Sequence, residues 1–327
     1  MQKKRLAVMG ATGLVGQAMI QVLQEYAIPY TSLRLFASAQ SAGQKIRVGH
    51  QSIVVEELKK DVFDGSIDVA LFALEANFAQ EFAPIAAATG CTVIDNSRAF
   101  RMEPHIPLVV PEVNAHTLKD YHGIIANPNC STIQSVVALA PLRKYGLKRV
   151  AYATYQAVSG SGKAGLEDLE RGLHGEEPKF YPHDIAFNVL PHIDSFLETG
   201  YTKEEQKMID ETRKILEMPE LKVTATTVRV PVRYGHCVEI NLCTEKAFEV
   251  EEVRELLRNS PGIIVMDEPN RAMYPTPLAA AGSDSVYVGR MRRDVSQENG
   301  LHLWCVADNV RKGAASNAVQ ILQRILQ

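Results

Sequence analysis

Cys130 lies in the stretch NPNCST (residues 127–132), between a short apolar run and a run with helical spacing. Pro128 cannot continue a strand, Asn129 favours a turn, and apolar residues recur at helical spacing from 133 to 140. We therefore expect Cys130 at a helix N-terminus, where backbone N–H groups and the helix dipole lower a thiol's pKa from about 8.5. The pattern indicates a nucleophilic thiol, although a small buried residue that starts a core helix fits the hexapeptide equally well.

A glycine-rich turn near the N-terminus predicts a dinucleotide site. The strand-like run 3–9 leads into GATGLVG (residues 10–16) and then into a helical pattern. Gly10 and Gly13 would allow a sharp turn and close approach to a pyrophosphate, and Gly16 would allow close packing of helix on strand. The glycine spacing differs from the commoner GxGxxG, so a glycine turn that binds nothing is the alternative.

The stretch after the second expected strand, 33–37, bears on the choice of cofactor. Residues 38–43 (SAQSAG) contain no Asp or Glu that could accept hydrogen bonds from a free ribose 2′-hydroxyl. Ser38, Ser41 and nearby backbone amides, with the basic Lys45 and Arg47, could hold a 2′-phosphate. The pattern favours NADP, while an ordinary surface loop fits the same residues.

Length, charge and cysteine usage exclude several classes of protein. The chain has 327 residues, enough for two domains, and its net charge of −3 gives no basic footprint for nucleic acid. Its five cysteines show neither CxxC pairs nor metal-ligand spacing, so we expect a reducing compartment and no metal site. We find no apolar run of about 18 residues and no signal-peptide pattern, and expect a cytoplasmic protein without a membrane partner.

The order of strand and helix patterns predicts an α/β protein with two domains. Short apolar strands (69–73, 91–94, 123–126) alternate with helical patterns such as 77–88, as in a doubly wound (Rossmann) parallel sheet. Longer alternating runs at 150–158, 222–232, 237–244 and 301–307 predict an α+β domain with a largely antiparallel sheet. We expect a first domain over 1–127, completed by a C-terminal helix within 308–327, and a second domain over 128–307.

A series of motifs in a fixed order carries a resemblance to a known family. They are GATGLVGQ, DNSRAFRM (95–102), PLVVPEVN (107–114), NPNCST, TYQAVSG (154–160), FNVLP (187–191), VRVPV and GHCVEI. Over nearly its whole length the chain resembles the aspartate-β-semialdehyde dehydrogenases. The resemblance implies NADPH-dependent, reversible reduction of L-aspartyl 4-phosphate to L-aspartate 4-semialdehyde and phosphate, in lysine, threonine and methionine biosynthesis. It also implies a homodimer, in some relatives a tetramer, formed through the second, catalytic domain.

The resemblance assigns catalytic roles to three residues. Cys130 matches the nucleophile, whose thiolate forms a thioester that then accepts a hydride. His236 matches the acid/base histidine that takes the thiol proton and later protonates the aldehyde oxygen, and Gln156 matches the residue that orients the acyl intermediate. We expect backbone amides at Asn129 and Cys130 to stabilise the developing oxyanion.

The resemblance also implies two sets of binding residues. The substrate set comprises Arg229 for the α-carboxylate, Glu204, Lys207 and Arg101 for substrate and phosphate, and Asn129. The cofactor set comprises Gly10, Thr12, Gly13, Leu14, Val15, Ser38, Gln40, Ser41, Ser159, Gly160 and Asn309. Thr202 and Glu205 have capping-box spacing, which leaves Glu204 for a ligand. An idle surface pair of Glu204 with Lys207, and a solvent-facing Arg229, are the plainer interpretations.

Departures from the family pattern leave alternatives open. Gln40 stands where many relatives carry an arginine, residues 73–77 (ALEAN) replace a loop with serine and glycine, and Arg98 replaces a common serine. A related acyl-phosphate or acyl-CoA reductase would share the thiol and the glycine turn. A non-catalytic NADP-binding paralogue would be expected to lose Cys130, and a thiol hydrolase has no use for the glycine turn.

Overall fold

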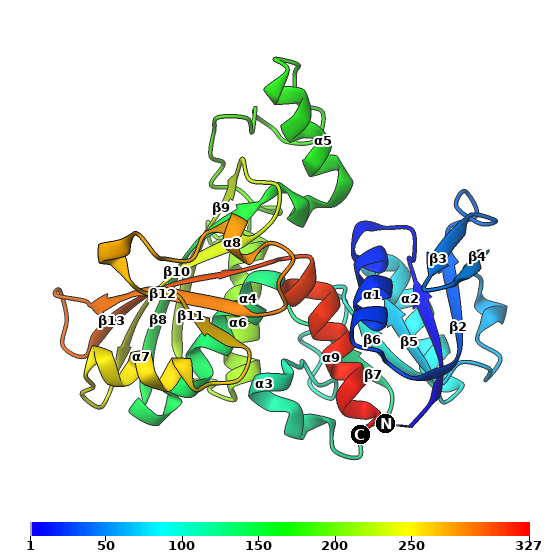
Figure 1. The fold of residues 1–327 in the computed structure, drawn as a ribbon, viewed down its shortest axis with the longest axis horizontal. Helices are drawn as coiled ribbons and strands as arrows, with labels where there is room; N and C mark the ends of the chain where they lie inside the picture. The colour runs from blue at the N-terminus through cyan, green and yellow to red at the C-terminus, as the bar shows by residue number, and fades with distance from the viewer. Residues whose placement is uncertain (1) are drawn as a thin grey trace. The chain divides into compact units, whose positions relative to one another are not determined.

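The computed structural model describes residues 2–327, which form two compact units (Figure 1). Unit 1 holds the residues up to Pro128 together with Ala314–Gln327, and unit 2 holds Asn129–Gly313. The C-terminal segment therefore returns to the unit in which the chain begins.

Unit 1 contains a seven-stranded sheet in the order β3-β4-β2-β1-β5-β6-β7. Its strands are β1 (Lys4–Met9), β2 (Tyr30–Ala37), β3 (Lys45–Val48), β4 (Gln51–Glu57), β5 (Val69–Phe72), β6 (Thr92–Asp95) and β7 (Ile124–Ala126). Its α-helices are α1 (Leu14–Glu25), α2 (Ala76–Ala88), α3 (Pro111–Asn114) and α9 (Ser316–Ile325). All neighbouring strands are parallel except the β3–β4 hairpin.

Helices cover both faces of this sheet, because alternate strand residues point to opposite sides. Leu6 and Val8 of β1 join a core with apolar residues of α1 and α9, whereas Ala7 and Met9 join a second core with α2. A strand buried on both sides reads as a continuous apolar run, and all four residues of β5 are buried. The predicted doubly wound fold is confirmed.

The glycine turn between β1 and α1 is held by backbone contacts. Gly10 has φ +83°, and the amides of Gly10 and Ala11 donate to the Phe36 carbonyl of β2 at 2.8 and 2.9 Å. A Cβ atom on Gly16 would lie 2.1 Å from the Gly10 carbonyl oxygen. The predicted close packing at Gly16 is thus confirmed.

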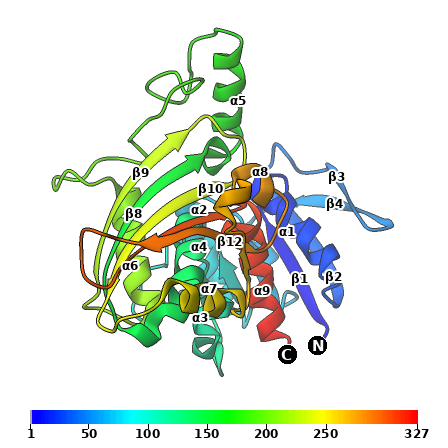
Figure 2. The same cartoon turned by 60° about the vertical axis from the view of Figure 1, so that its left-hand side comes forward.

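Unit 2 contains a six-stranded sheet in the order β11-β12-β13-β10-β8-β9. Its strands are β8 (Leu147–Ala157), β9 (Lys222–Val230), β10 (His236–Thr244), β11 (Ile263–Val265), β12 (Val286–Arg293) and β13 (Gly300–Ala307). Its α-helices are α4 (Cys130–Leu139), α5 (Gly162–Leu173), α6 (Lys203–Leu216), α7 (Val250–Arg258) and α8 (Pro277–Ala280). The three central pairings are antiparallel and the two outer ones parallel, in a sheet of long curved strands (Figure 2).

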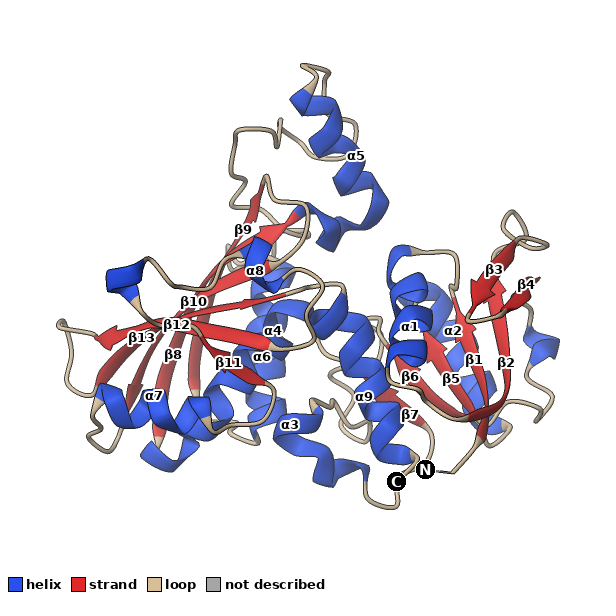
Figure 3. Ribbon diagram, in the orientation of Figure 1, coloured by secondary structure: helices blue, strands red, loops and turns tan. Residues whose placement is uncertain are grey.

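Figure 3 shows the helices and strands of the two units, and two of the helices begin where the sequence predicts. α4 begins at Cys130, and the capping box of Thr202 and Glu205 is present at the start of α6. Lys45 and Arg47, the basic residues that could hold a 2′-phosphate, lie in β3, which pairs with β4 in a hairpin. The predicted C-terminal helix is preceded by a π-helical turn over Arg311–Ala315.

Within residues 2–327, no helix is long and apolar enough to cross a membrane. The same residues contain no group of three or more His, Cys, Asp and Glu side chains arranged to hold a metal ion.

Gly16→Ala should destabilise the protein far more than Gly13→Ala. The new Cβ at 16 would collide with the backbone of Gly10, and we expect a loss of about 2 kcal/mol or more despite the better helix propensity of alanine. Gly13 has φ −77° and only one atom near its potential Cβ, at 3.4 Å, so alanine there should cost less than about 1 kcal/mol. Urea unfolding followed by circular dichroism measures both, and equal losses would contradict the packing role of Gly16.

Candidate active site

Cys130 is the first residue of α4, and Asn129 caps that helix. The Asn129 side-chain oxygen accepts hydrogen bonds from the amides of Ser131 and Thr132 at 3.0 and 3.2 Å. Cys130 is half-buried, and a Cβ on Gly313 would lie 2.9 Å from the Cβ of Cys130. The cap holds the thiol at the positive end of the helix dipole, and Gly313 leaves room beside it.

The amide of Asn129 has a partner that the sequence did not reveal. It donates to Oε2 of Glu211 in α6 at 2.7 Å, and the Glu211 side chain is buried. This amide is therefore not open to a substrate oxyanion in this structure. The expectation that it supplies an oxyanion donor is wrong here, because a long-range carboxylate uses it first.

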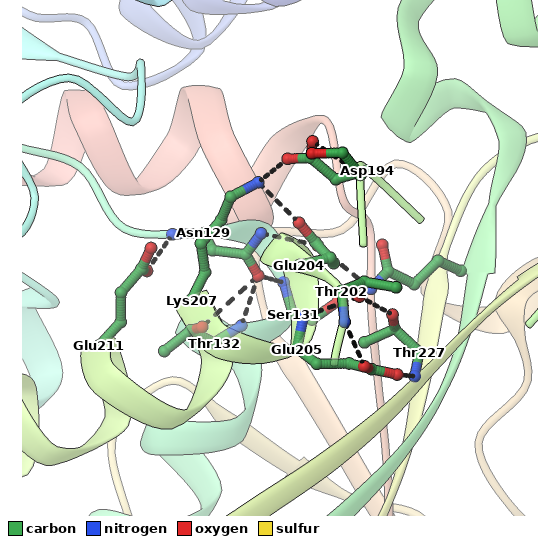
Figure 4. A network of polar contacts seen from close by, with 12 residues as sticks. Asn129, Ser131, Thr132, Asp194, Thr202, Glu204, Glu205, Lys207, Glu211 and Thr227 are labelled. Carbon is green, nitrogen blue, oxygen red and sulfur yellow. Dashed lines mark hydrogen bonds and ion pairs between the residues drawn. The ribbon is translucent and has the colours of Figure 1, made fainter. Parts of the chain in front are cut away.

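Glu204 is the centre of the polar network in Figure 4. Its Oε1 accepts hydrogen bonds from Asn129 Nδ2 at 2.8 Å and Gln156 Nε2 at 3.3 Å, and its Oε2 lies 3.1 Å from Lys207 Nζ. Burial favours protonation of Glu204, but the charge of Lys207 and the Asn129 hydrogen bond outweigh it and lower the pKa. Three predicted site residues thus surround an ionised carboxylate, which rules out an idle surface pair.

Lys207 contacts a second carboxylate, that of Asp194, at 2.8 Å (Figure 4). Burial alone would lower the pKa of Lys207, but the charges of Glu204 and Asp194 and their hydrogen bonds raise it. The ammonium is therefore charged at neutral pH. Asp194 was not among the predicted residues; it has a left-handed φ of +65°, and its side chain also accepts a hydrogen bond from the Ser195 amide at 2.8 Å.

Arg229 lies on β9 and is only 4% exposed, so the solvent-facing interpretation is wrong. One terminal nitrogen donates to the Ala157 carbonyl at 2.8 Å. Its Nε is buried and has no hydrogen-bond partner among the described residues. A buried guanidinium with an unused donor suits an anionic ligand that is not part of the protein.

His236 is the first residue of β10 and is completely buried. The Ala157 amide donates to its Nδ1 at 3.0 Å, so a neutral ring in this arrangement carries its proton on Nε2. Burial, and then the charge of Arg229, hold the pKa of His236 well below 6.5. Nε2 is buried without a partner in the described part of the chain, and a Cβ on Gly160 would lie 3.1 Å from it.

Ser159 and Asn309, both predicted cofactor contacts, are hydrogen-bonded to each other in unit 2. Asn309 Nδ2 donates to Ser159 Oγ at 2.9 Å, and Asn309 Oδ1 accepts from the amide of Gly235 at 2.9 Å. Because Gly235 precedes His236, this pair also fixes the entry to β10.

The other predicted binding residues belong to unit 1. Arg101 is buried and donates to the carbonyls of Asn127 and Asn96 at 3.0 and 2.9 Å. The turn with Gly10, Thr12, Gly13, Leu14 and Val15 begins α1, whose N-cap Gly13 provides no side-chain cap. Ser38, Gln40 and Ser41 lie in the turn after β2.

Three of the other four thiols differ from Cys130 in their surroundings. Burial raises the pKa of Cys91 and of Cys237 to about 12, and it raises the pKa of Cys305 further. Such thiols are unreactive at neutral pH. Cys130 is the one that stands at a helix start beside polar side chains.

Comparisons with known proteins agree on one family. The family model described as "Semialdehyde dehydrogenase, NAD binding domain" matches residues 5–121, and "Semialdehyde dehydrogenase, dimerisation domain" matches residues 139–312. Aspartate-semialdehyde dehydrogenase of Aquifex aeolicus is 51% identical over 99% of this chain and 98% of its own. The Bacillus subtilis enzyme is 46% identical over 98% and 96% of the two chains.

Solved structures give the same answer. Aspartate semialdehyde dehydrogenase II of Vibrio cholerae has a TM-score of 0.95 and 43% identity, covering 99% of each chain, and it has also been solved in complex with ASA. The Candida albicans enzyme with NADP has a TM-score of 0.79 and 28% identity, covering 99% and 98%. The chain therefore belongs to the aspartate-semialdehyde dehydrogenase family of oxidoreductases.

Proposed function

We propose that this protein reduces L-aspartyl 4-phosphate to L-aspartate 4-semialdehyde and phosphate with NADPH, reversibly, through a thioester on Cys130. The observation that carries the proposal is the network in which Asn129, the residue before the thiol, bonds Glu204, which in turn contacts Gln156 and Lys207. This network joins the nucleophile to charged groups suited to a charged substrate. We further propose that this reaction serves lysine, threonine and methionine biosynthesis.

In the first step the Cys130 thiolate attacks the acyl carbon. A carbon–sulfur bond forms, the carbon–oxygen bond to phosphate breaks, and phosphate leaves with the bonding electrons. Position 130 favours the thiolate because helix N-terminal amides and the dipole stabilise negative charge. Gln156 is proposed to orient the acyl group, since its side chain is buried beside Glu204.

Charged residues are proposed to hold the two ends of the substrate. Arg229 offers its unused donors to the α-carboxylate, and ionised Glu204 can accept from the α-ammonium. Lys207 has three N–H donors, of which Asp194 and Glu204 occupy two, which leaves one for phosphate. Arg101 is proposed as a further phosphate ligand.

His236 is proposed to act through Nε2. In the tautomer set by Ala157, Nε2–H is a donor that stabilises the oxyanion formed at the thioester carbon. Collapse of that oxyanion breaks the carbon–sulfur bond and returns Cys130 as a thiolate, so no further proton is needed for release. The expected role as acceptor of the thiol proton would require the other tautomer and loss of the Ala157 hydrogen bond.

The glycine turn of unit 1 fits a dinucleotide. Gly13 caps α1 without a side chain, so the first amides of that helix can face a pyrophosphate. When bound, the nicotinamide cofactor supplies the hydride that reduces the thioester. We propose NADP, held by Ser38, Gln40 and Ser41 at the ribose phosphate, with Ser159, Gly160 and Asn309 as further contacts.

The assembly and compartment are also proposals. The matched dimerisation domain supports a homodimer formed through residues 128–307, with residues 1–127 and 308–327 as the cofactor domain. A tetramer is the further possibility in this family. Five cysteines without paired spacing support the reducing cytoplasm.

Purified protein should reduce NADP with L-aspartate semialdehyde only when phosphate is present. Cys130→Ser should lower kcat by about 10³-fold or more, because serine is not activated by the same surroundings. Cys243→Ser, a half-buried thiol on β10, is the matched control and should stay within about 2-fold of wild type. Folded protein that is inactive with this substrate but active with N-acetyl-glutamate semialdehyde would instead identify a related acyl-phosphate reductase.

Neutral His236 predicts a pH dependence of stability. The pKa of His236 is about 6.5 in the unfolded chain and lower in the folded one, so below about pH 6.5 the unfolded state binds more protons. The free energy of unfolding therefore decreases as the pH is lowered below about 6.5. His236→Gln should remove up to about 1.4 kcal/mol per pH unit of that loss. Urea unfolding from about pH 5 to about pH 8 tests this. An identical pH dependence of variant and wild type would contradict it.

The cofactor preference can be tested in the turn after β2. We expect kcat/KM with NADP to exceed that with NAD by about 10-fold or more. Gln40→Asp should shift the ratio toward NAD, because a carboxylate repels a 2′-phosphate and accepts from a 2′-hydroxyl. Gln44→Asp makes the same change at a nearby exposed position and should leave the ratio unchanged. Equal shifts in both variants would assign the effect to net charge.

A further inference from the structure

Gln134 lies one helical turn beyond Cys130 and is completely buried. Its side-chain Nε2 donates to two backbone carbonyls, that of His236 at 3.1 Å and that of Cys305 at 3.2 Å. These acceptors are 102 and 171 positions away in the sequence. One amide group therefore ties the helix that begins with Cys130 to two distant segments.

The two acceptors belong to neighbouring strands. His236 begins β10, and Cys305 of β13 pairs with Val238 in the same ladder. The imidazole of His236 is fixed separately, by the Ala157 amide of β8. α4 therefore contacts the backbone of His236, which also pairs with β13, while β8 contacts its ring.

The side-chain oxygen of Gln134, Oε1, indicates that the contacts of Nε2 set the orientation of the amide. Oε1 is buried and has no hydrogen-bond partner among residues 2–327. Nε2 faces the carbonyls of His236 and Cys305 and, at 3.9 Å, the sulfur of Cys305, so rotating the amide would place its oxygen against two carbonyl oxygens. Most buried polar atoms are hydrogen-bonded, and one left without a partner is costly. The Gln134 side chain therefore leaves Oε1 without a partner while its Nε2 bonds both β10 and β13.

We propose that Gln134 is a positioning residue that fixes Cys130 relative to Nε2 of His236. The proposal rests on the proposed function of these two residues. Four residues of helix rise only about 6 Å, so an anchor at 134 leaves the start of α4 little freedom to move. Misplacement of reacting groups by about 1 Å can lower a rate by about 100-fold.

The decisive variant is Gln134→Met, which keeps the approximate volume and removes the donor. Ser135→Ala is the matched control, because Ser135 is the next residue of α4, is equally buried, and donates only to Ser131 of the same helix, at 2.7 Å. Steady-state kinetics would follow phosphate-dependent NADP reduction by L-aspartate semialdehyde. Iodoacetamide labelling of Cys130, located by mass spectrometry, would report on the thiol alone.

We expect Gln134→Met to lower kcat by about 10-fold to 100-fold, with KM and Cys130 labelling within about 2-fold of wild type. Ser135→Ala should match wild type in all three. An unchanged kcat would overturn the proposal and leave Gln134 a packing residue. Equal loss of labelling and kcat would also overturn it, because the reactivity of the thiol, and not its position relative to His236, would then explain the lower rate.

Gln134→Glu provides a second test if the methionine variant does not fold. Burial should keep the new carboxyl protonated, and its single O–H can still donate to one carbonyl. Raising the pH would ionise this carboxyl group, and the carboxylate would then repel the carbonyl oxygens of His236 and Cys305. We therefore expect kcat of this variant alone to fall with rising pH, and a wild-type pH profile would overturn the proposal.

Crystal structures of the wild type and a Gln134 variant separate this proposal from the proposed function. An inactive wild type would refute the function, but the distance between Cys130 Sγ and His236 Nε2 can still be compared. We expect it to change by more than about 0.5 Å in the variant. An unchanged distance would overturn the positioning role whatever the activity.

Discussion

The site of unit 2 depends on Asn129, which uses three of its polar groups to hold the start of α4 against α6. Its side-chain oxygen caps α4, its side-chain nitrogen donates to Glu204, and its backbone amide donates to Glu211. Both carboxylates lie on α6, so Asn129 connects the start of one helix to the side of another. Replacing Asn129 by alanine would remove the cap beneath the thiol and one of the donors to buried Glu204, while the backbone amide at 129 would remain for Glu211.

The buried charges are arranged so that each has an opposite charge or a dipole nearby. Glu204 faces Lys207, Lys207 faces Asp194, and Arg229 contacts a carbonyl. Desolvating such groups costs more than their pairing returns unless hydrogen bonds complete the set. The incomplete places, Nε of Arg229 and Nε2 of His236, are those at which a substrate could supply the missing partner.

Local patterns predicted the parts of the site that depend on nearby residues. The turn at Pro128 and Asn129, the capping box at Thr202 and the glycine packing at Gly16 each involve residues within a few positions of one another. Glu211 and Gln134 act across 82 and 102 positions, and nothing in their own neighbourhood marks them. Their roles arise only when α4, α6 and β10 pack together, which no periodicity reveals.

The unusual loop at 73–77 shows why a departure in sequence need not change the glycine turn. A Cβ on Gly10 would lie 2.3 Å from the Ala73 carbonyl oxygen, so the turn and the loop meet through their backbones. Any residue at 73 supplies that carbonyl, and Glu75 caps α2 without a side-chain hydrogen bond. The constraint therefore falls on Gly10, which has no room for a side chain, and not on the side chain at position 73.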